Sequence, residues 1–331
     1  LLIAPLALGL TVAWLELRHR LRPSSPLRMT PLDWRVNDLG DRLQVEGLLE
    51  ISNPHPRMEI FVPELRVEPV LLGRSDPSSL QLSTRITAEH PDEPTRADGY
   101  WAAYIVKGHK TTRARVTIEI EGASPLERID SLWVEAHWVN YGPFGRLQRR
   151  QGVLVPLKRP EPLKPQQATF LKGEGCEVLA LGTHLLGPLD DPIEVLRTYA
   201  SDLLQPGDVL TIGETPVAVI QGRYRHPSEV QPGMVARLAC RVFHPTSSLA
   251  TACGMQTLID LVGPTRVIAA WFAGLLLKLV GLPGGFYRLA GDQARLIDDI
   301  TGTTPPYDQT IVLGPLHSEA FCRRAAAELG V

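Results

Sequence analysis

LQVEGLLEI, residues 43–51, decides the fold of the first half of the chain. Its apolar and polar side chains alternate, so they point to opposite faces of one extended strand. The same period of two recurs in ARVTIEIE, residues 114–121, and in LWVEAHW, residues 132–138. Turn-forming residues such as Asn53-Pro54 separate these runs. The pattern predicts an antiparallel β-sandwich over residues 28–155.

Length and composition limit the possible classes of protein. The chain has 331 residues, which predicts two domains, and its net charge of -2 with a pI near 6.5 supplies no field for attracting nucleic acid. We therefore expect no nucleic-acid partner. The four cysteines are far apart and form no Cys-x-x-Cys pair, so neither a zinc site nor a disulfide framework is indicated.

The first segment has the composition of a membrane helix. Residues 1–15, LLIAPLALGLTVAWL, carry no charge, and Arg18, Arg20 and Arg22 follow them. This order favours an uncleaved anchor over residues 1–17; a signal peptide and a buried helix are the alternatives. The positive-inside rule then predicts a single-pass protein with cytoplasmic domains. Because a span needs about 20 apolar residues, we expect the anchor to be truncated.

A proline-rich linker and a second domain are expected beyond the sandwich. Residues 156–168 show neither a helical nor a strand period, whereas residues 169–331 suggest a mixed α/β domain, giving an α+β protein overall. Asp190-Asp191-Pro192 has the composition of a helix start. We predict strands over residues 177–181, 208–213 and 217–223, and a helix over residues 321–328.

The second domain contains an ordered series of motifs, beginning with THLLGPLDD at 183–191, LQPGDVL at 204–210 and QGR at 221–223 and ending with AGDQA at 290–294 and IVLGPLHSEA at 311–320. This series resembles the coenzyme F-420 gamma-glutamyl ligases. The resemblance covers about residues 176–331, and the family sequence continues past residue 331, so we expect the domain to be incomplete. More weakly, VEGLLEISNP and the following IFVPEL in residues 45–65 resemble the late-embryogenesis-abundant type of β-sandwich.

The resemblance implies a GTP-dependent ligase that uses Mg²⁺ or Mn²⁺ to form a gamma-glutamyl amide bond with L-glutamate. Separately, the N-terminal anchor predicts contact with membrane lipid, and a homodimer is a further expectation. Carried over by position, Asp208 and Arg223 would bind nucleotide or phosphate. The carboxylates that would hold the metal are Asp190, Asp191 and Asp292, and the separate pair Asp298-Asp299 has the oxygen ligands that such ions prefer.

Each of these residues also has a structural interpretation. Asp190 and Asp191 suit a helix cap, and Asp208 suits a turn after Pro-Gly. Arg223 suits a surface ion pair, and Asp298-Asp299 suit an exposed acidic turn.

The third family motif departs from the family pattern. Where the family carries Lys, Ser, Lys and Glu, this chain has Thr215, Ala218, Val219 and Gln221. This loss of polar groups motivates an alternative function, a non-catalytic binding or assembly module at the cytoplasmic membrane face.

Two further segments have open interpretations. Residues 267–282 form an apolar run with one lysine, which predicts either a core helix or an interfacial, re-entrant helix. Arg146, Arg149 and Arg150 form a basic cluster that suits either anionic lipid headgroups or a solvated turn.

Overall fold

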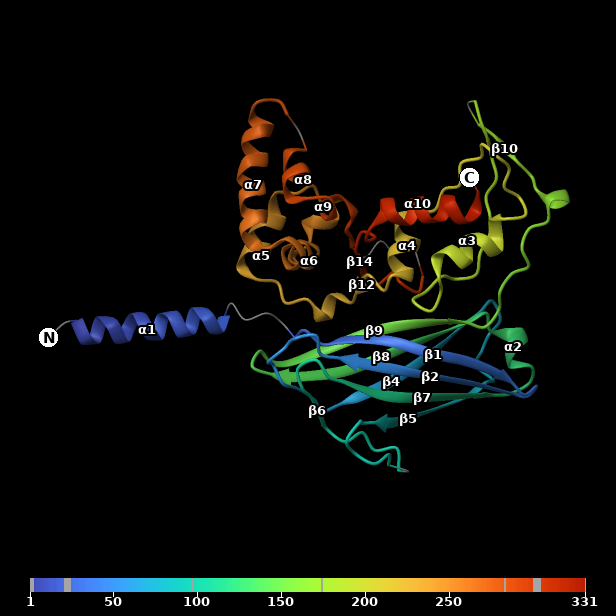
Figure 1. Ribbon diagram of the computed structural model, residues 1–331, viewed down its shortest axis with the longest axis horizontal. Helices are drawn as coiled ribbons and strands as arrows, with labels where there is room; N and C mark the ends of the chain where they lie inside the picture. Colours follow the sequence, from blue (N-terminus) through green and yellow to red (C-terminus); the bar gives the residue numbers. More distant parts are fainter. Residues whose placement is uncertain are drawn as a thin grey trace.

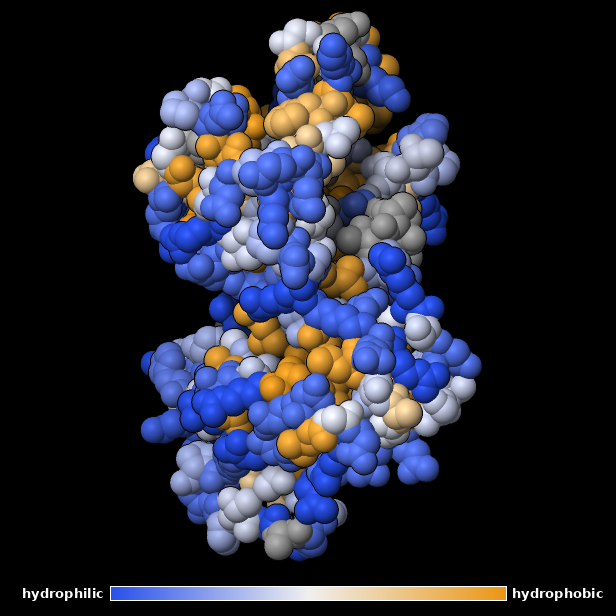
Figure 2. All heavy atoms as spheres, turned by 90° about the vertical axis from the view of Figure 1, so that its right-hand side faces the viewer, coloured by the Kyte–Doolittle hydropathy of each residue, from blue (hydrophilic) through white to orange (hydrophobic). Residues whose placement is uncertain are grey.

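The computed structural model describes residues 3–20, 25–96, 98–173, 175–282, 284–299 and 305–330. It divides into a β-sandwich and a mainly helical lobe that lies over one face of the sandwich (Figure 1). An α+β protein with an N-terminal sandwich is therefore confirmed. Figure 2 views the molecule from one end and shows the two lobes meeting at a narrower waist.

The sandwich consists of two antiparallel sheets. In the first, the strands lie in the order β1-β2-β7-β5, and in the second β8 pairs with β4 and β3 along one edge and with β9 along the other, while β6 pairs with β3. The strands of the first sheet are β1 (Arg28–Asp38), β2 (Arg42–Ser52), β5 (Gln81–Glu89) and β7 (Thr111–Glu121). Those of the second are β3 (Ile60–Val62), β4 (Leu65–Leu72), β6 (Tyr104–Val106), β8 (Ser131–Gly142) and β9 (Gly145–Pro156), and α2 (Pro125–Arg128) connects β7 to β8.

Strict alternation positions the core of the sandwich. Along β2, every second residue from Leu43 to Ile51 is buried, and β7 repeats the pattern from Thr112 to Ile120. These side chains meet the inner face of β8, where Leu132, Val134 and Ala136 are buried. The predicted alternation thus forms one continuous apolar layer between the sheets.

The helical lobe contains short helices and few strand residues. Its helices are α3 (Pro192–Ala200), α4 (Glu214–Ile220), α5 (Met234–Ala239), α6 (Ala252–Val262), α7 (Pro264–Leu279), α8 (Gly285–Ala290), α9 (Gln293–Leu296) and α10 (Ser318–Leu329). Its 3-10 turns are η1 (Pro165–Gln167), η2 (Pro227–Glu229), η3 (Cys240–Val242) and η4 (Ser248–Ala250). Its two-residue strands are β10 (Leu171–Lys172), β11 (Glu177–Val178), β12 (Tyr224–Arg225), β13 (Asp298–Asp299) and β14 (Ile311–Val312).

Several predicted elements of this lobe need correction. The predicted strand over residues 217–223 is wrong, because residues 214–220 form helix α4, and residues 208–213 carry no strand. Within 177–181 only Glu177–Val178 are extended in a sheet. Val217 to Ile220 are all buried, and a short apolar run suits a buried helix as well as a buried strand. The helices predicted after Asp191 and over 321–328 are confirmed.

The N-terminal segment forms helix α1 (Ile3–Arg20), which projects away from the sandwich in Figure 1. Within the described residues, no single helix combines the length and apolar composition that a membrane crossing requires. Helices α6 and α7 reach that length and composition only together, as a pair bent by 114°. Arg22, one of the three arginines expected to orient the anchor, lies outside the described residues.

A small apolar core joins the two lobes. It contains Trp133 and Leu154 from the outer face of the second sheet and five residues of the helical lobe. Gly152 leaves space for the Trp133 ring, since a Cβ there would lie 1.7 Å from Trp133 Cζ2. The residues contributed by the helical lobe are Ala218, Val219, Tyr224, Tyr307 and Val312.

Candidate functional site

A cleft of about 350 Å³ lies between the sandwich and the helical lobe, and it is the site we consider first. The beginning of β1, the hairpin β8–β9, and residues 220–229 line it. Its charged lining consists of four arginines and one carboxylate, namely Arg28, Arg149, Arg150, Arg225 and Glu229.

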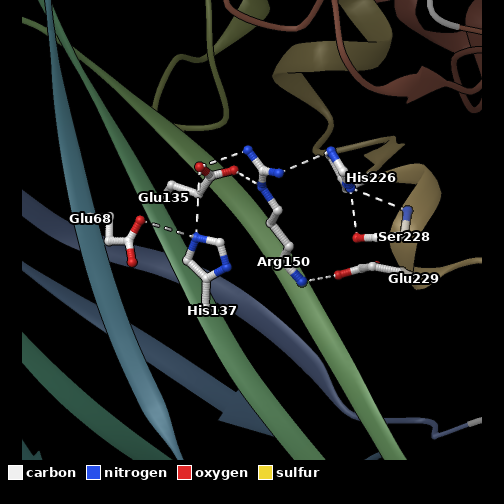
Figure 3. Close-up of polar contacts among 7 residues, drawn as sticks. All are labelled: Glu68, Glu135, His137, Arg150, His226, Ser228 and Glu229. Carbon is white, nitrogen blue, oxygen red and sulfur yellow. Dashed lines mark hydrogen bonds and ion pairs between the residues drawn. The ribbon is translucent and has the colours of Figure 1, made fainter.

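The β8–β9 hairpin positions two of these arginines on opposite faces. Its register pairs Trp138 with Arg149 and His137 with Arg150, so the two arginine side chains point to opposite sides of the sheet. The Arg149 guanidinium lies 6.0 Å from the centroid of the Trp138 ring, within the range of a cation–π contact. Arg150 instead points toward the helical lobe together with Glu135 and His137 (Figure 3).

Arg150 connects the two lobes through a polar network. Its Nε and Nη2 both donate to the Glu135 carboxylate, and the Nη2 to Oε2 distance is 2.9 Å. On its other side, Nη1 lies 3.2 Å from Nε2 of His226 in the helical lobe. His137 Nε2 lies 3.7 Å from Glu135 and 3.9 Å from Glu68, distances too long for hydrogen bonds. The bidentate contact to Glu135 fixes the Arg150 head at the junction.

His226 is held in its neutral form. An arginine donates only, so His226 Nε2 is the acceptor for Arg150, while Nδ1 lies 3.2 Å from the Ser228 backbone nitrogen and 2.7 Å from Ser228 Oγ. Burial and then the charge of Arg150 lower the pKa of His226. Protonation would therefore break the hydrogen bond across the junction.

Glu229 is the one carboxylate in the lining of the cleft. Its side chain is 8% exposed, and it accepts a hydrogen bond from the backbone N–H of Arg150, while Arg149 Nη1 lies at 3.9 Å. Burial raises the pKa of Glu229, although Arg149, the Arg150 N–H and Arg225 oppose that shift. The carboxylate is thus occupied by the hairpin rather than free to receive a ligand.

Three buried donors at the cleft have no partner. Nε of Arg149, Nε of Arg225 and Nε1 of Trp138 donate no hydrogen bond within the described part of the chain. Arg225 keeps one ion pair, from Nη2 to Asp260 at 2.9 Å, and Arg28 is exposed at the rim. Unpaired donors with excess positive charge suit an oxyanion, which accepts hydrogen bonds and carries negative charge.

The predicted metal and phosphate residues lie elsewhere. Asp190 is buried and accepts from Gly187 N–H at 2.9 Å, with His184 Nε2 at 3.0 Å and Arg159 at 3.7 Å. Asp191 caps α3 by accepting from the N–H groups of Ile193 and Glu194. Asp208 accepts from Gln205 N–H at 2.8 Å within a turn. These three carboxylates therefore stabilise local structure of the chain.

The other predicted residues are distributed along the helical lobe. Arg223 donates to Gly314 O at 2.6 Å and to Gln293 Oε1 at 3.2 Å, and burial lowers its pKa. The Asp292 side chain is 91% exposed. Thr251 donates to Asp299, and Ser248 Oγ lies 3.5 Å from Asp298. Among the described residues, no group of three His, Cys, Asp or Glu side chains could hold a metal ion, so the arrangement does not fit the implied metal.

Sequence reasoning missed most of the cleft. It noted Arg149 and Arg150 but did not single out Tyr224, His226 or Glu229. The two-residue turn Pro143-Phe144 sets the β8–β9 register and carried a usable signal, since counting back from it pairs Arg149 with Trp138.

Comparison with known proteins finds one family model that matches the sandwich. Residues 28–159 match the family model of the F420-0:gamma-glutamyl ligase N-terminal Ig-like domain. The match falls on the sandwich and names the family to which the motifs of residues 176–331 pointed. No curated protein matches the chain.

Several solved structures are similar to part of this chain. The GAE domain of GGA2p from Saccharomyces cerevisiae is 10% identical, with 42% of this chain and 96% of that chain covered and a TM-score of 0.25. The yeast GGA1 GAE domain is 14% identical, with 41% of this chain and 96% of that chain covered and a TM-score of 0.24. The PapD-like domain 7 of human CEP192 is 12% identical, with 41% of this chain and 87% of that chain covered and a TM-score of 0.22. Such scores carry no argument about function. Residues 28–159 are thus similar to the N-terminal Ig-like domain of the F420-0:gamma-glutamyl ligases.

Proposed function

We propose that this protein is a binding module that holds an oxyanion, a carboxylate or a phosphate group, in the cleft between its lobes. One observation carries the proposal: the buried donors Arg149 Nε, Arg225 Nε and Trp138 Nε1 have no partner among the described residues, in a cleft lined by four arginines and one carboxylate. A bound oxyanion would balance the excess positive charge of this lining.

Calorimetry on the full chain in detergent tests this proposal, with L-glutamate, GTP and inorganic phosphate as separate probes. Arg28 lies at the rim of the cleft and has no ion pair within the described ranges, so Arg28→Gln should weaken binding about fivefold or more, the loss expected for one charge-assisted contact. Arg35→Gln, on the same strand but outside the cleft, is the matched control. Absence of binding heat with all three probes, or equal weakening by both variants, would count against the cleft.

We further propose that α1 anchors the chain in a membrane. The uncharged residues 1–15 and the arginines that follow them support this. By the positive-inside rule, the two lobes would lie on the cytoplasmic side. Extraction of the native protein with carbonate should leave it in the membrane fraction, whereas release into the supernatant would contradict an anchor.

A second candidate function is GTP- and metal-dependent gamma-glutamyl ligation. It is supported by the family match of the sandwich and by the motif series of residues 183–320. Nucleotide contact by Asp208 and Arg223 would require both to give up hydrogen bonds within the chain. Its test is mass spectrometry for a glutamate adduct of the coenzyme F-420 precursor with GTP and Mn²⁺. Adduct formation would favour the ligase, whereas oxyanion binding without turnover would favour the binding module.

A further inference from the structure

Helix α7 exposes apolar side chains where a soluble helix would carry polar ones. Ile268, Phe272, Leu275, Leu276 and Leu279 are spaced i, i+4, i+7, i+8 and i+11, which places them on one face across three turns. They are between 38% and 77% exposed. The apolar surface continues beyond the helix through Val280 and Leu282. A patch of this kind marks an interaction surface.

The opposite face of α7 is already occupied by its neighbour α8. Val267 and Ala270 are buried, and Gly274 lies so close to Phe286 that a Cβ there would be 2.7 Å from the Phe286 backbone nitrogen. The α7–α8 hairpin is therefore fixed in the lobe, and the exposed stripe cannot turn inward without unpacking it.

Basic residues outnumber acidic ones in the segment that contains α7. Between Glu229 and Asp292 the sequence contains five basic residues and one acidic residue, although the whole chain has a net charge of -2. The one acidic residue, Asp260, pairs with Arg225. The basic residues are Arg237, Arg241, Arg266, Lys278 and Arg288. An apolar stripe within a segment that has this excess of basic residues suits an anionic lipid surface.

The position of α7 agrees with a membrane contact. In Figure 1, α7 forms the outer edge of the helical lobe at the end of the molecule from which α1 projects, and α8 lies on its inner side. The outer face of α7 thus points toward the side on which α1 extends. At 16 residues, α7 is about 24 Å long, shorter than the hydrocarbon core, so it suits lying in the interface rather than spanning it.

Charge also argues against a second copy of this chain as the occupant. A symmetric dimer through α7 would bring two copies of this basic segment together, and the like charges would repel. We infer that the α7 stripe inserts into the cytoplasmic leaflet of an anionic membrane, as a second contact that sets the orientation of the lobes on the surface. The inference does not depend on the oxyanion cleft.

A depth-sensitive fluorescent probe tests this contact in the full chain. The exposed Cys176 and Cys322 are first changed to Ser, and a probe is attached through Leu276→Cys on the stripe or through Glu319→Cys on α10 as the matched position. Each protein is reconstituted in phosphatidylcholine vesicles containing phosphatidylglycerol, with part of the lipid brominated along its chains. Bromolipid should quench the probe at 276 and leave the probe at 319 unchanged.

A charge-introducing variant controls for the stripe itself. Phe272→Glu with Leu279→Glu should abolish quenching at 276, whereas Phe170→Glu with Val209→Glu, equally exposed apolar positions elsewhere, should not. Near-ultraviolet circular dichroism checks that each variant folds. An unquenched probe at 276 in protein that floats with the vesicles would overturn the inference and leave the α1 anchor standing. If raising the protein concentration without lipid shields the probe at 276 from solvent, the stripe contacts a second copy of the chain and the inference is overturned.

Discussion

Gly152 on β9 shows how one residue permits the contact between the lobes. Without a side chain at this position, the Trp133 ring lies against the strand and packs edge-on against Tyr307 at 5.1 Å. A Cβ would lie 1.7 Å from the Trp133 ring, so the ring would have to move, and it belongs to the core that both lobes share.

We therefore predict that Gly152→Ala lowers the free energy of unfolding by about 1–3 kcal/mol, the usual cost of overpacking. Gly182→Ala is the control, because a Cβ there meets nothing within 4 Å. Urea unfolding followed by tryptophan fluorescence measures both. Equal values for the two variants would show that Trp133 adjusts without cost.

His226 should make stability depend on pH. Burial and the charge of Arg150 lower its pKa below the ordinary value of 6.5, so the folded protein favours the neutral ring. Its contribution is complete above pH 6.5 and is lost as the pH falls through the folded pKa. Thermal melting in buffers on either side of pH 6.5 should show a melting temperature that falls at acid pH, and the fall should be smaller in His226→Gln. An unchanged slope in the variant would assign the decline to other groups.

Glu229 must be separated from His226 in that experiment because its pKa shifts the other way. Burial raises the pKa of Glu229, so its stabilising contribution is present at low pH and is lost as the pH rises through the folded pKa. Melting of Glu229→Gln, which keeps an acceptor for the Arg150 N–H, isolates this opposite slope.

At the scale of elements, the N-cap of helix α3 is the carboxylate of Asp191. Asp191 accepts from two N–H groups of the first turn, as an N-cap does. Asp191→Ala should cost about 0.5–2 kcal/mol of stability, and Asp191→Asn should cost much less, since Asn caps nearly as well. Differential scanning fluorimetry with and without Mn²⁺ is the measurement. Stabilisation by Mn²⁺ that disappears in Asp191→Asn would restore the metal role predicted from the sequence.

Secondary-structure elements could be predicted where the local hydropathy pattern fits only one type of element. Strands β2 and β7 of the first sheet alternate strictly, because one face of that sheet is buried in the sandwich core and the other is more exposed. Helix α3 follows from its cap and its proline. Helix α4 did not, since its buried run Val217 to Ile220 has no period and only the surrounding lobe determines its form.

At the scale of the whole molecule, Tyr224 connects the lobes. Its hydroxyl donates to the Gly152 carbonyl at 2.6 Å inside a buried site. Tyr224→Phe should cost about 1–3 kcal/mol, because the carbonyl would remain buried without its donor. Tyr141→Phe, at a position 53% exposed, should cost far less. A similar loss in both variants, measured by urea unfolding, would mean that water replaces the Tyr224 hydroxyl.

The cleft could not be deduced from the sequence for a related reason. Arg150 and His226 are separated by 76 positions and meet only because the helical lobe packs on the outer face of β8 and β9. The predicted carboxylates failed to converge for the same reason, since motif order does not place Asp190 near Asp298 in space.

The docking of the helical lobe on β9 has a consequence for the sandwich. β9 pairs with β8 on one side only, and the outward N–H of Arg150 and carbonyl of Gly152 are bound by Glu229 and Tyr224. An uncovered edge strand of this length is a template for another strand. The helical lobe thus protects the sandwich from polymerisation. Residues 25–159 produced alone should form oligomers that light scattering detects, whereas the full chain in detergent should not.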